Sequence, residues 1–82
     1  MKLIYTERAA KDIRRLPPDI KRRLGTTLAR YRDFPYLYAR KLNNPHLGNY
    51  RFRMGSYRIM FDIEDDAMVI LRVGHRRDIY RG

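Results

Sequence analysis

Apolar residues recur at two different spacings along this chain of 82 residues, one typical of helices and one typical of strands. Residues 1–6 form a short, mixed-apolar opening that predicts a strand, and Thr6 is a residue type that caps helices. The apolar residues that follow have helical spacing: Ala9, Ile13 and Leu16. Pro17-Pro18 then interrupts this pattern, so we expect a first helix between Thr6 and the prolines.

A second helix is predicted directly after the proline pair. Its apolar positions form one stripe at spacings of four, four and three residues: Ile20, Leu24, Leu28 and Tyr31. Between the stripe positions lie basic residues: Lys21, Arg22, Arg23 and Arg30. The sequence Asp33-Phe34-Pro35 closes this helix. Residues 35–48 have no clean period, and we interpret them as a connecting loop anchored by Leu42 and Leu47.

The second half of the chain contains three segments that resemble strands, near residues 49–54, 57–63 and 67–74. The full order is then a strand, a two-helix hairpin and a three-stranded antiparallel meander, followed by a short tail. This order predicts an α+β fold in which the helices cover one face of a four-stranded sheet. The length suits a single domain over residues 1–82. The expected core includes Ile13, Leu16, Leu24, Leu28, Phe52, Ile59, Phe61 and Leu71.

The segment 49–59 predicts a hairpin that carries arginines on one face. With Gly55-Ser56 as a two-residue loop, Arg53 lies opposite Arg58. The period of two places one set of side chains against the helices: Tyr50, Phe52, Met54, Tyr57, Ile59, Phe61 and Ile63. The other face carries Arg51, Arg53 and Arg58. Like charges that face each other across two strands destabilise the pair by roughly 0.2–1 kcal/mol, so this arrangement favours a functional role over a merely solvated sheet face.

The register of the last strand depends on the length of the loop before it. A three-residue loop at 64–66 places on the core side Ala67, Val69, Leu71 and Val73. It places on the open side Met68, Ile70 and Arg72. A two-residue loop would invert this order and bury Arg72, so we expect the three-residue loop. The open face would then carry an apolar patch beside the arginines, made of Met60, Met68 and Ile70.

The composition is strongly basic, with 19 Lys and Arg against 9 Asp and Glu and a net charge of +10. Most of the basic residues are arginines, whose planar guanidinium group suits bidentate contact with phosphate or carboxylate. The expected partner is therefore a polyanion, either nucleic acid or an acidic protein. Residues 1–46 carry most of the net charge, which indicates that the helices and the loop after them attract the partner at long range.

Several features bear on the location of the protein. The chain has no cysteine and therefore no disulfide framework, which favours an intracellular protein. A charge at Glu7 interrupts the N-terminus too early for a signal peptide. The longest apolar run, residues 67–71, is far shorter than a membrane span. We therefore expect a soluble, cytoplasmic protein without a membrane partner.

The residue types favour phosphate chemistry by arginine over catalysis by a metal or a serine. The only histidines, His46 and His75, lack a clustered ligand set, and the only serine, Ser56, lies in the predicted turn. Arginine is no ordinary base because its pKa exceeds about 12. It does stabilise charge that develops on a phosphoryl group. The arginines therefore suit phosphate binding, or cleavage of RNA with the substrate's own 2′-hydroxyl as nucleophile.

The chain also contains three stretches with family character, which read IYTERAAKDIRRL, YRFRMGSYRIMFDI and VGHRRDIY. In this order they resemble the RelE/ParE toxins of bacterial and archaeal toxin–antitoxin systems, and the resemblance covers nearly the whole chain. RelE-like members cleave messenger RNA, typically in the ribosomal A site, whereas ParE-like members inhibit DNA gyrase. RelE-like members use basic residues on the sheet together with a terminal tyrosine.

The resemblance implies a catalytic set in this chain: Arg51, Arg53, Arg58, Arg76 and Tyr80. Well-studied members carry lysines at the positions of Arg51 and Arg53. Because arginine cannot act as the base, the identity of the base is left open, with His75 as a candidate. Arg51 and Arg53 are also expected to hold the RNA backbone, together with four further arginines: Arg22, Arg23, Arg72 and Arg77.

The resemblance favours a metal-independent mRNA endonuclease that needs no cofactor and acts on ribosome-bound mRNA. It further implies a cognate antitoxin, acidic or of mixed charge, that wraps the toxin and blocks its basic face. Two alternatives remain open. One is a ParE-like gyrase inhibitor, and the other is a catalytically inactive RNA- or protein-binding module of the same fold.

Overall fold

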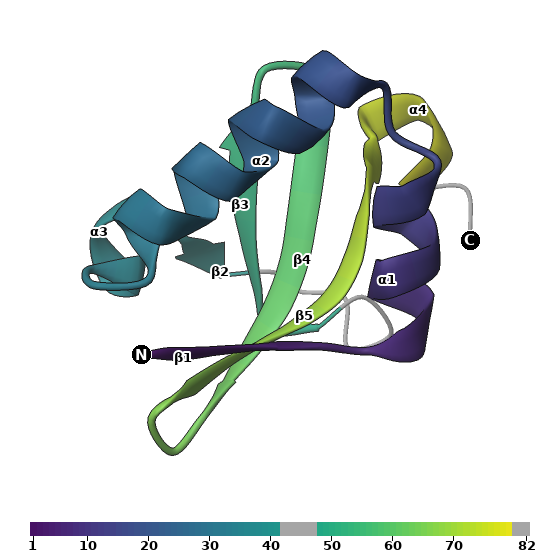
Figure 1. The fold of residues 1–82 in the computed structure, drawn as a ribbon. Helices are drawn as coiled ribbons and strands as arrows, with labels where there is room; N and C mark the ends of the chain where they lie inside the picture. Colours follow the sequence, from purple (N-terminus) through teal and green to yellow (C-terminus); the bar gives the residue numbers. More distant parts are fainter. Residues whose placement is uncertain (42–47, 80–82) are drawn as a thin grey trace.

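The computed structural model describes residues 1–41 and 48–79. Within them, one strand is followed by three helices, four further strands and a final short helix (Figure 1). The elements are β1 (Lys2–Tyr5), α1 (Glu7–Arg14), α2 (Pro18–Tyr31), α3 (Pro35–Tyr38), β2 (Arg40–Lys41), β3 (Tyr50–Met54), β4 (Tyr57–Glu64), β5 (Ala67–His75) and α4 (Arg76–Ile79). None of the helices in these two ranges is long and apolar enough to cross a membrane.

The strands form one sheet in the order β1-β5-β4-β3-β2, in which only β1 and β5 pair in parallel. In Figure 1, α2 crosses in front of β3 and β4, and α1 runs beside β5. The predicted α+β class is confirmed, but the predicted number of four strands is wrong. The segment expected to be a loop contains α3 and the additional strand β2. The expected anchors Leu42 and Leu47 lie outside the described residues.

The first helix begins and ends where the sequence predicts. The Thr6 hydroxyl oxygen accepts a hydrogen bond from the Ala9 N–H at 3.1 Å, which caps α1. The same hydroxyl donates to the Leu71 carbonyl at 3.1 Å and so ties the cap to β5. The helix ends at Arg14, shortly before the two prolines. A single threonine therefore sets both the start of α1 and its position against the sheet.

The core lies between the two longer helices and the sheet. The hairpin register is confirmed: Phe52 pairs with Ile59 and Arg53 pairs with Arg58. The predicted core residues that are buried are Leu16, Leu24, Leu28, Phe52, Ile59 and Phe61. Ile13 is partly buried and packs against them. The rings of Phe52 and Phe61 stack with centroids 4.4 Å apart, so β3 and β4 contribute the aromatic centre of this core.

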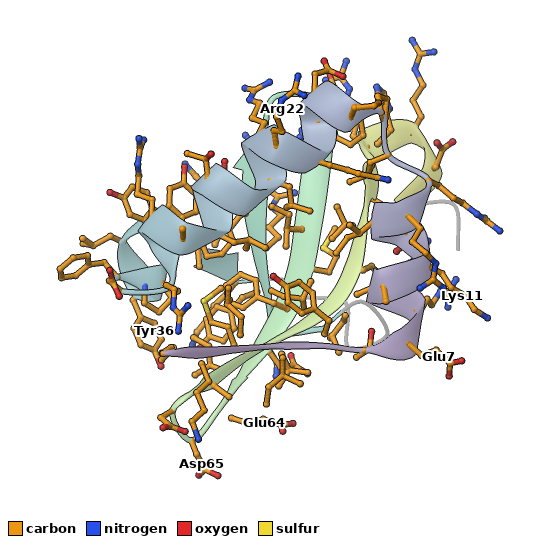
Figure 2. The ribbon with its side chains drawn as sticks, in the orientation of Figure 1. Glu7, Lys11, Arg22, Tyr36, Glu64 and Asp65 are labelled. Carbon is orange, nitrogen blue, oxygen red and sulfur yellow. The ribbon has the colours of Figure 1, made fainter. Side chains whose placement is uncertain are left out.

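The predicted three-residue loop before β5 is wrong. Glu64 pairs with Ala67, so the turn contains only Asp65 and Asp66, and Figure 2 shows Asp65 at its tip. Asp65 has a φ of 55°, in the left-handed region that aspartate tolerates better than most residues. The shorter turn brings Met68 and Ile70 to the helix side of the sheet, where both are fully buried in the core.

A β-bulge then restores the alternation that the shorter turn had shifted. Phe61 pairs with Ile70 and Met60 pairs with Arg72, which leaves Leu71 as the extra residue. Beyond the bulge Val73 faces the core, as predicted, and Arg72 stays out of it. Val69 and Leu71 are only half-buried, contrary to expectation. The predicted apolar patch does not exist, because Met60, Met68 and Ile70 are all buried.

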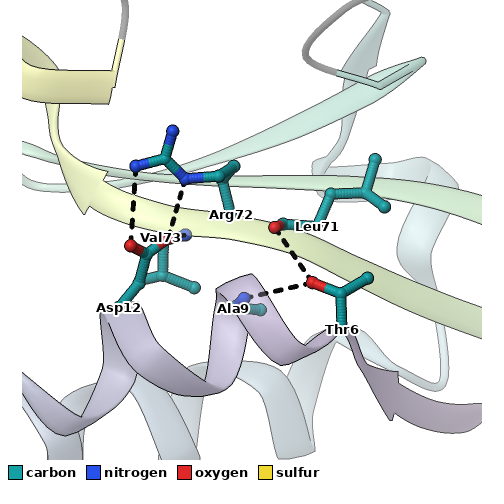
Figure 3. A network of polar contacts seen from close by, with 6 residues as sticks. All are labelled: Thr6, Ala9, Asp12, Leu71, Arg72 and Val73. Atoms are coloured by element: carbon teal, nitrogen blue, oxygen red, sulfur yellow. Dashed lines mark hydrogen bonds and ion pairs between the residues drawn. The ribbon is translucent and has the colours of Figure 1, made fainter. Parts of the chain in front are cut away.

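Asp12 of α1 closes the edge of β5 beyond the end of β1 (Figure 3). Its Oδ2 atom accepts hydrogen bonds from the backbone N–H of Val73 at 3.0 Å and from Nε of Arg72 at 2.9 Å. Both side chains are largely buried, so the pair is screened less than a surface ion pair. One carboxylate thus satisfies a strand-edge donor and neutralises the arginine that the bulge turns outward.

The side chain of Leu71 packs against Gly48, where a larger residue would not fit. Gly48 has a φ of +101°, and a Cβ atom there would lie 2.6 Å from Leu71 Cδ1 and 3.3 Å from the Phe61 carbonyl oxygen. Gly25 on α2 is the opposite case, because an added Cβ would have nothing within 4 Å. The two glycines therefore predict substitution effects of opposite sign.

We expect Gly48→Ala to lower the free energy of unfolding by about 1–3 kcal/mol, because it combines a strained φ with overpacking. Gly25→Ala should raise the same quantity by roughly 0.5–1 kcal/mol, since alanine is the better helix former. Urea denaturation followed by circular dichroism measures both. A Gly48→Ala protein as stable as the wild type would contradict the packing described around Leu71.

Candidate nucleic-acid interface

The sheet face that points away from α1 and α2 carries two rows of residues defined by the strand register. The row beside the β3–β4 turn contains Arg53, Arg58 and Gly74. The next row contains Arg40, Arg51, Met60 and Arg72. Residues directly opposite each other project from the same face of a sheet, so the arginines share one side. We call this surface the arginine face.

Arg40 belongs to the arginine face but is not predicted from the sequence. It lies on β2, directly opposite Arg51, and is exposed. A strand of two residues is too short to show a period of two, and the following residues contain Asn43-Asn44-Pro45, which are typical of a loop. Only the pairing with β3 reveals that Arg40 adds a fourth strand to the basic surface.

Arg58 is the most constrained side chain of this face. It is 8% exposed, and its Nη1 atom donates to the carbonyl oxygens of Gly55 at 2.8 Å and of Tyr57 at 2.9 Å. Its Nε atom is buried without a hydrogen-bond partner among the described residues. The guanidinium group is therefore held in one position by the turn, while some of its donors remain available to an anion.

The β3–β4 turn also holds the start of α4. The backbone N–H of Arg76 donates to the Ser56 carbonyl at 2.8 Å, so Arg76 begins α4 directly beside the turn. The side chains of Arg53, Arg76 and Arg77 are exposed. The residues predicted to be a tail thus form a short helix, and Ile79 of that helix is buried against Gly74 on the arginine face.

The structure distributes the other predicted site residues differently. Arg51 is half-buried in the second row, and Arg72 is ion-paired with Asp12, which reduces the attraction of its charge for phosphate. Arg22 is exposed on the outer side of α2 (Figure 2). The guanidinium group of Arg23 reaches the turn at Gly55. Tyr80 lies outside the described residues, so its role stays a prediction.

His75 lies on the helix side of the sheet and not beside Arg58. Its ring makes an edge contact with Tyr57, at a centroid distance of 5.6 Å, and Tyr57 packs against the core. Its Nδ1 atom accepts a hydrogen bond from the Arg77 N–H at 3.1 Å. That nitrogen is therefore occupied, which makes His75 a poor candidate for the base of a reaction on the arginine face.

The nearest carboxylate on β4 that shares the arginine face is that of Asp62. It is four residues from Arg58, or about 13 Å along an extended strand. Its Oδ1 atom accepts a hydrogen bond from the Asn49 N–H at 2.7 Å. Within residues 1–41 and 48–79, no three side chains of His, Asp or Glu come close enough together to hold a metal ion. Among the described residues of this face, Arg58 is thus a cation held by backbone carbonyls, with no metal site beside it.

The surroundings of Tyr5 alter the titration of its phenol. Burial raises the pKa of the Tyr5 phenol above its ordinary value of 10.0, and the nearby charge of Arg32 partly opposes this rise. Tyr5 lies on β1, which β5 and β4 separate from β3. The phenol therefore stays neutral at physiological pH and is remote from the arginine face.

Comparison with known proteins identifies the family. Residues 3–80 match the family described as the ParE toxin of type II toxin–antitoxin systems. The chain belongs to the RelE/ParE toxin superfamily. It is 34% identical over 87 residues to the toxin RelG of Mycobacterium tuberculosis, with 94% of this chain and 92% of RelG covered. It is 29% identical to the toxin RelE3 of Methanocaldococcus jannaschii, with 98% of this chain and 96% of RelE3 covered.

The solved structures of the superfamily have the same fold. The toxin–antitoxin complex RelBE2 of Mycobacterium tuberculosis contains a chain that matches this one with a TM-score of 0.75 and 31% identity. The match covers 92% of this chain and 96% of the other. The resemblance to RelE/ParE toxins that the sequence indicated is therefore confirmed.

Proposed function

We propose that this toxin is an endoribonuclease that cleaves messenger RNA on the ribosome. The observation that carries the proposal is the position of Arg58, which is held by two carbonyl oxygens in the centre of the row beside the turn. A buried cation with a fixed geometry stabilises charge that develops on a phosphate without first having to reorganise. The names of the relatives RelG and RelE3 support the same branch of the superfamily.

In the proposed reaction, the 2′-hydroxyl oxygen of the RNA attacks the adjacent phosphorus atom. A P–O2′ bond forms, the P–O5′ bond breaks, and the 2′-hydroxyl proton is lost while the leaving 5′-oxygen gains a proton. The products are a 2′,3′-cyclic phosphate and a 5′-hydroxyl, so the step consumes no water. Arg58 stabilises the charge on the non-bridging oxygens, and Arg76 acts beside it on the phosphate or the leaving group. Tyr80 stacks on a base or helps to transfer a proton.

The remaining arginines of this face have a positioning role in the proposal. Arg51 and Arg53 hold the RNA backbone, and Arg40 extends the surface onto β2. Arg77 and the helix arginines Arg22 and Arg23 add attraction at long range. In the proposal, electrostatic stabilisation by Arg58 supplies the main catalytic effect.

The proposal includes a cognate antitoxin and a cytoplasmic location, where mRNA and ribosomes occur. The RelBE2 structure is that of a toxin–antitoxin complex, which supports a protein partner of this kind. An acidic or mixed-charge segment would neutralise the arginine face. The contact on this face would be mainly electrostatic, since Met60, Met68 and Ile70 are buried.

Inhibition of DNA gyrase is a second candidate function, because the matching family is described as the ParE toxin. The two functions predict different damage in cells. An mRNA endonuclease should arrest growth and cut translated messages without inducing the DNA damage response. A gyrase poison should induce that response and leave messages intact.

The test combines primer extension on a translated reporter with an assay for double-strand breaks, both after induced expression. We expect cuts within the translated part of the reporter and no increase in breaks. Breaks with an intact reporter would establish the gyrase function instead. Binding of RNA with neither effect would identify an inactive binding module.

We further expect Arg58→Ala to lower the rate of RNA cleavage by about 10²–10³-fold, because it removes one preorganised donor. Arg58→Lys should recover only part of the rate, since a lysine carries the charge without the planar fork. Arg14→Ala, an exposed arginine on α1, is the control and should cleave at the wild-type rate. Circular dichroism establishes that each variant is folded. Wild-type cleavage by folded Arg58→Ala would exclude the role given to Arg58.

A further inference from the structure

A basic cleft separates α2 from the end of the β3–β4 hairpin. It has a volume of about 330 Å³ and is lined by Arg23, Thr26, Thr27, Arg30, Tyr31, Arg53, Met54 and Gly55. Arg23 and Arg30 come from α2, and Arg53 comes from β3. No acidic residue is among the described residues that line the cleft. Its position on the helix side of the hairpin distinguishes it from the arginine face.

The free edge of β3 creates this cleft. Strand β2 pairs with β3 only at Tyr50 and Arg51, so none of the strands in residues 1–41 and 48–79 covers the edge at Arg53 and Met54. Arg53 is exposed there and lies directly opposite Arg58 on β4. It therefore belongs both to the arginine face and to the cleft lining, and connects the two surfaces around the edge of the sheet.

The guanidinium group of Arg23 lies beside the turn at Gly55. The Nη1 and Nη2 atoms of Arg23 lie 3.5 and 3.6 Å from the point where a Cβ atom of residue 55 would stand. The turn is thus contacted from both sides, by Arg23 from the helix and by Arg58 through its bond to the Gly55 carbonyl. Any anion in the cleft would lie close to the site where Arg58 is held.

The helix presents a polar stripe to this cleft. Arg23, Thr26, Thr27 and Arg30 are spaced by three, one and three residues, which places them on one side of α2. Among the described residues, no carboxylate forms an ion pair with Arg23, Arg30 or Arg53. Three such guanidinium groups around one hollow repel one another. An anionic ligand in the cleft would relieve this repulsion.

We propose that this cleft binds a phosphate of the RNA backbone, separate from the phosphate that is held at Arg58. The inference rests on the proposed RNA substrate and adds a second subsite to it. In this proposal the RNA strand runs from the arginine face around the edge of β3 at Arg53. It then enters the cleft between Arg23 and Arg30. The cleft recognises phosphate and not a base, so its contribution is independent of the RNA sequence.

The test measures binding of single-stranded RNA with 2′-O-methyl groups, which cannot be cleaved by 2′-oxygen attack. One probe has about ten nucleotides, within the usual range for single-strand sites, and the other is a dinucleotide. The cleft variant carries Arg23→Ala and Arg30→Ala. The matched control carries Arg8→Ala and Arg14→Ala, which remove the same charge from exposed positions of α1.

We expect the cleft variant to bind the longer RNA about tenfold more weakly than the control variant does. Its plot of log K against log salt concentration should be shallower by about 0.7, the value for one lost phosphate contact on a single strand. The dinucleotide is too short to occupy both subsites, so the two variants should bind it equally. Equal affinities of the cleft and control variants for the longer RNA would overturn the proposal.

The binding result is independent of whether the protein is a nuclease, because neither probe can be cleaved. If the cleft variant loses affinity while wild-type protein leaves translated reporters intact, the subsite stands and the nuclease proposal fails. If wild-type protein cleaves the reporter and both variants bind alike, only the subsite fails. A poly-glutamate peptide of matched charge tests for an acidic protein ligand. Selective loss of peptide binding, with RNA binding unchanged, would also overturn the RNA subsite.

Discussion

The burial of one row of apolar residues determines where the arginines of this toxin lie. Phe52, Ile59 and Val73 lie side by side across β3, β4 and β5, and all three are buried. Since side chains alternate along a strand, the next row must face outward, and it contains Arg53 and Arg58. Burying a large apolar side chain stabilises a protein by about 1.5–3 kcal/mol, which exceeds the cost of a like-charge pair, roughly 0.2–1 kcal/mol. The core can therefore hold a repulsive surface in place.

The β3–β4 turn gathers that surface into a site. Its two residues supply carbonyl oxygens to the Arg58 side chain and to the Arg76 backbone, and the guanidinium group of Arg23 lies beside Gly55. Three segments that are distant in sequence thus bring arginines to one turn. The arrangement concentrates positive charge where a phosphate can be held from several sides, and this is the physical basis for proposing a nuclease in this superfamily of toxins.

The sequence predicts the parts of this structure that depend on local pattern. Alternation and the Gly55-Ser56 loop were sufficient for the hairpin register. The register predicted for β5 was wrong because it assumed strict alternation, which the bulge at Leu71 breaks. The side chain of Leu71 is accommodated by Gly48, which is distant in sequence. A two-residue turn was expected to bury Arg72. The bulge instead keeps Arg72 out of the core, and Asp12 pairs with its charge. The position of Arg40 depends on the pairing of β2 with β3, and that of Arg23 depends on the packing of α2 against the turn. Neither contact can be predicted from the periodicity of the local sequence.

The central claim is the proposal that the arginine face, without a protein nucleophile, directs cleavage of RNA by its own 2′-hydroxyl. It is tested most directly by replacing the ribonucleotide on the 5′ side of a mapped cut with its 2′-deoxy form, in an mRNA bound to ribosomes. Cleavage at that position should stop, while the unmodified message should give a 2′,3′-cyclic phosphate and a 5′-hydroxyl. Undiminished cleavage of the 2′-deoxy message, or products that end in a 5′-phosphate, would contradict the claim.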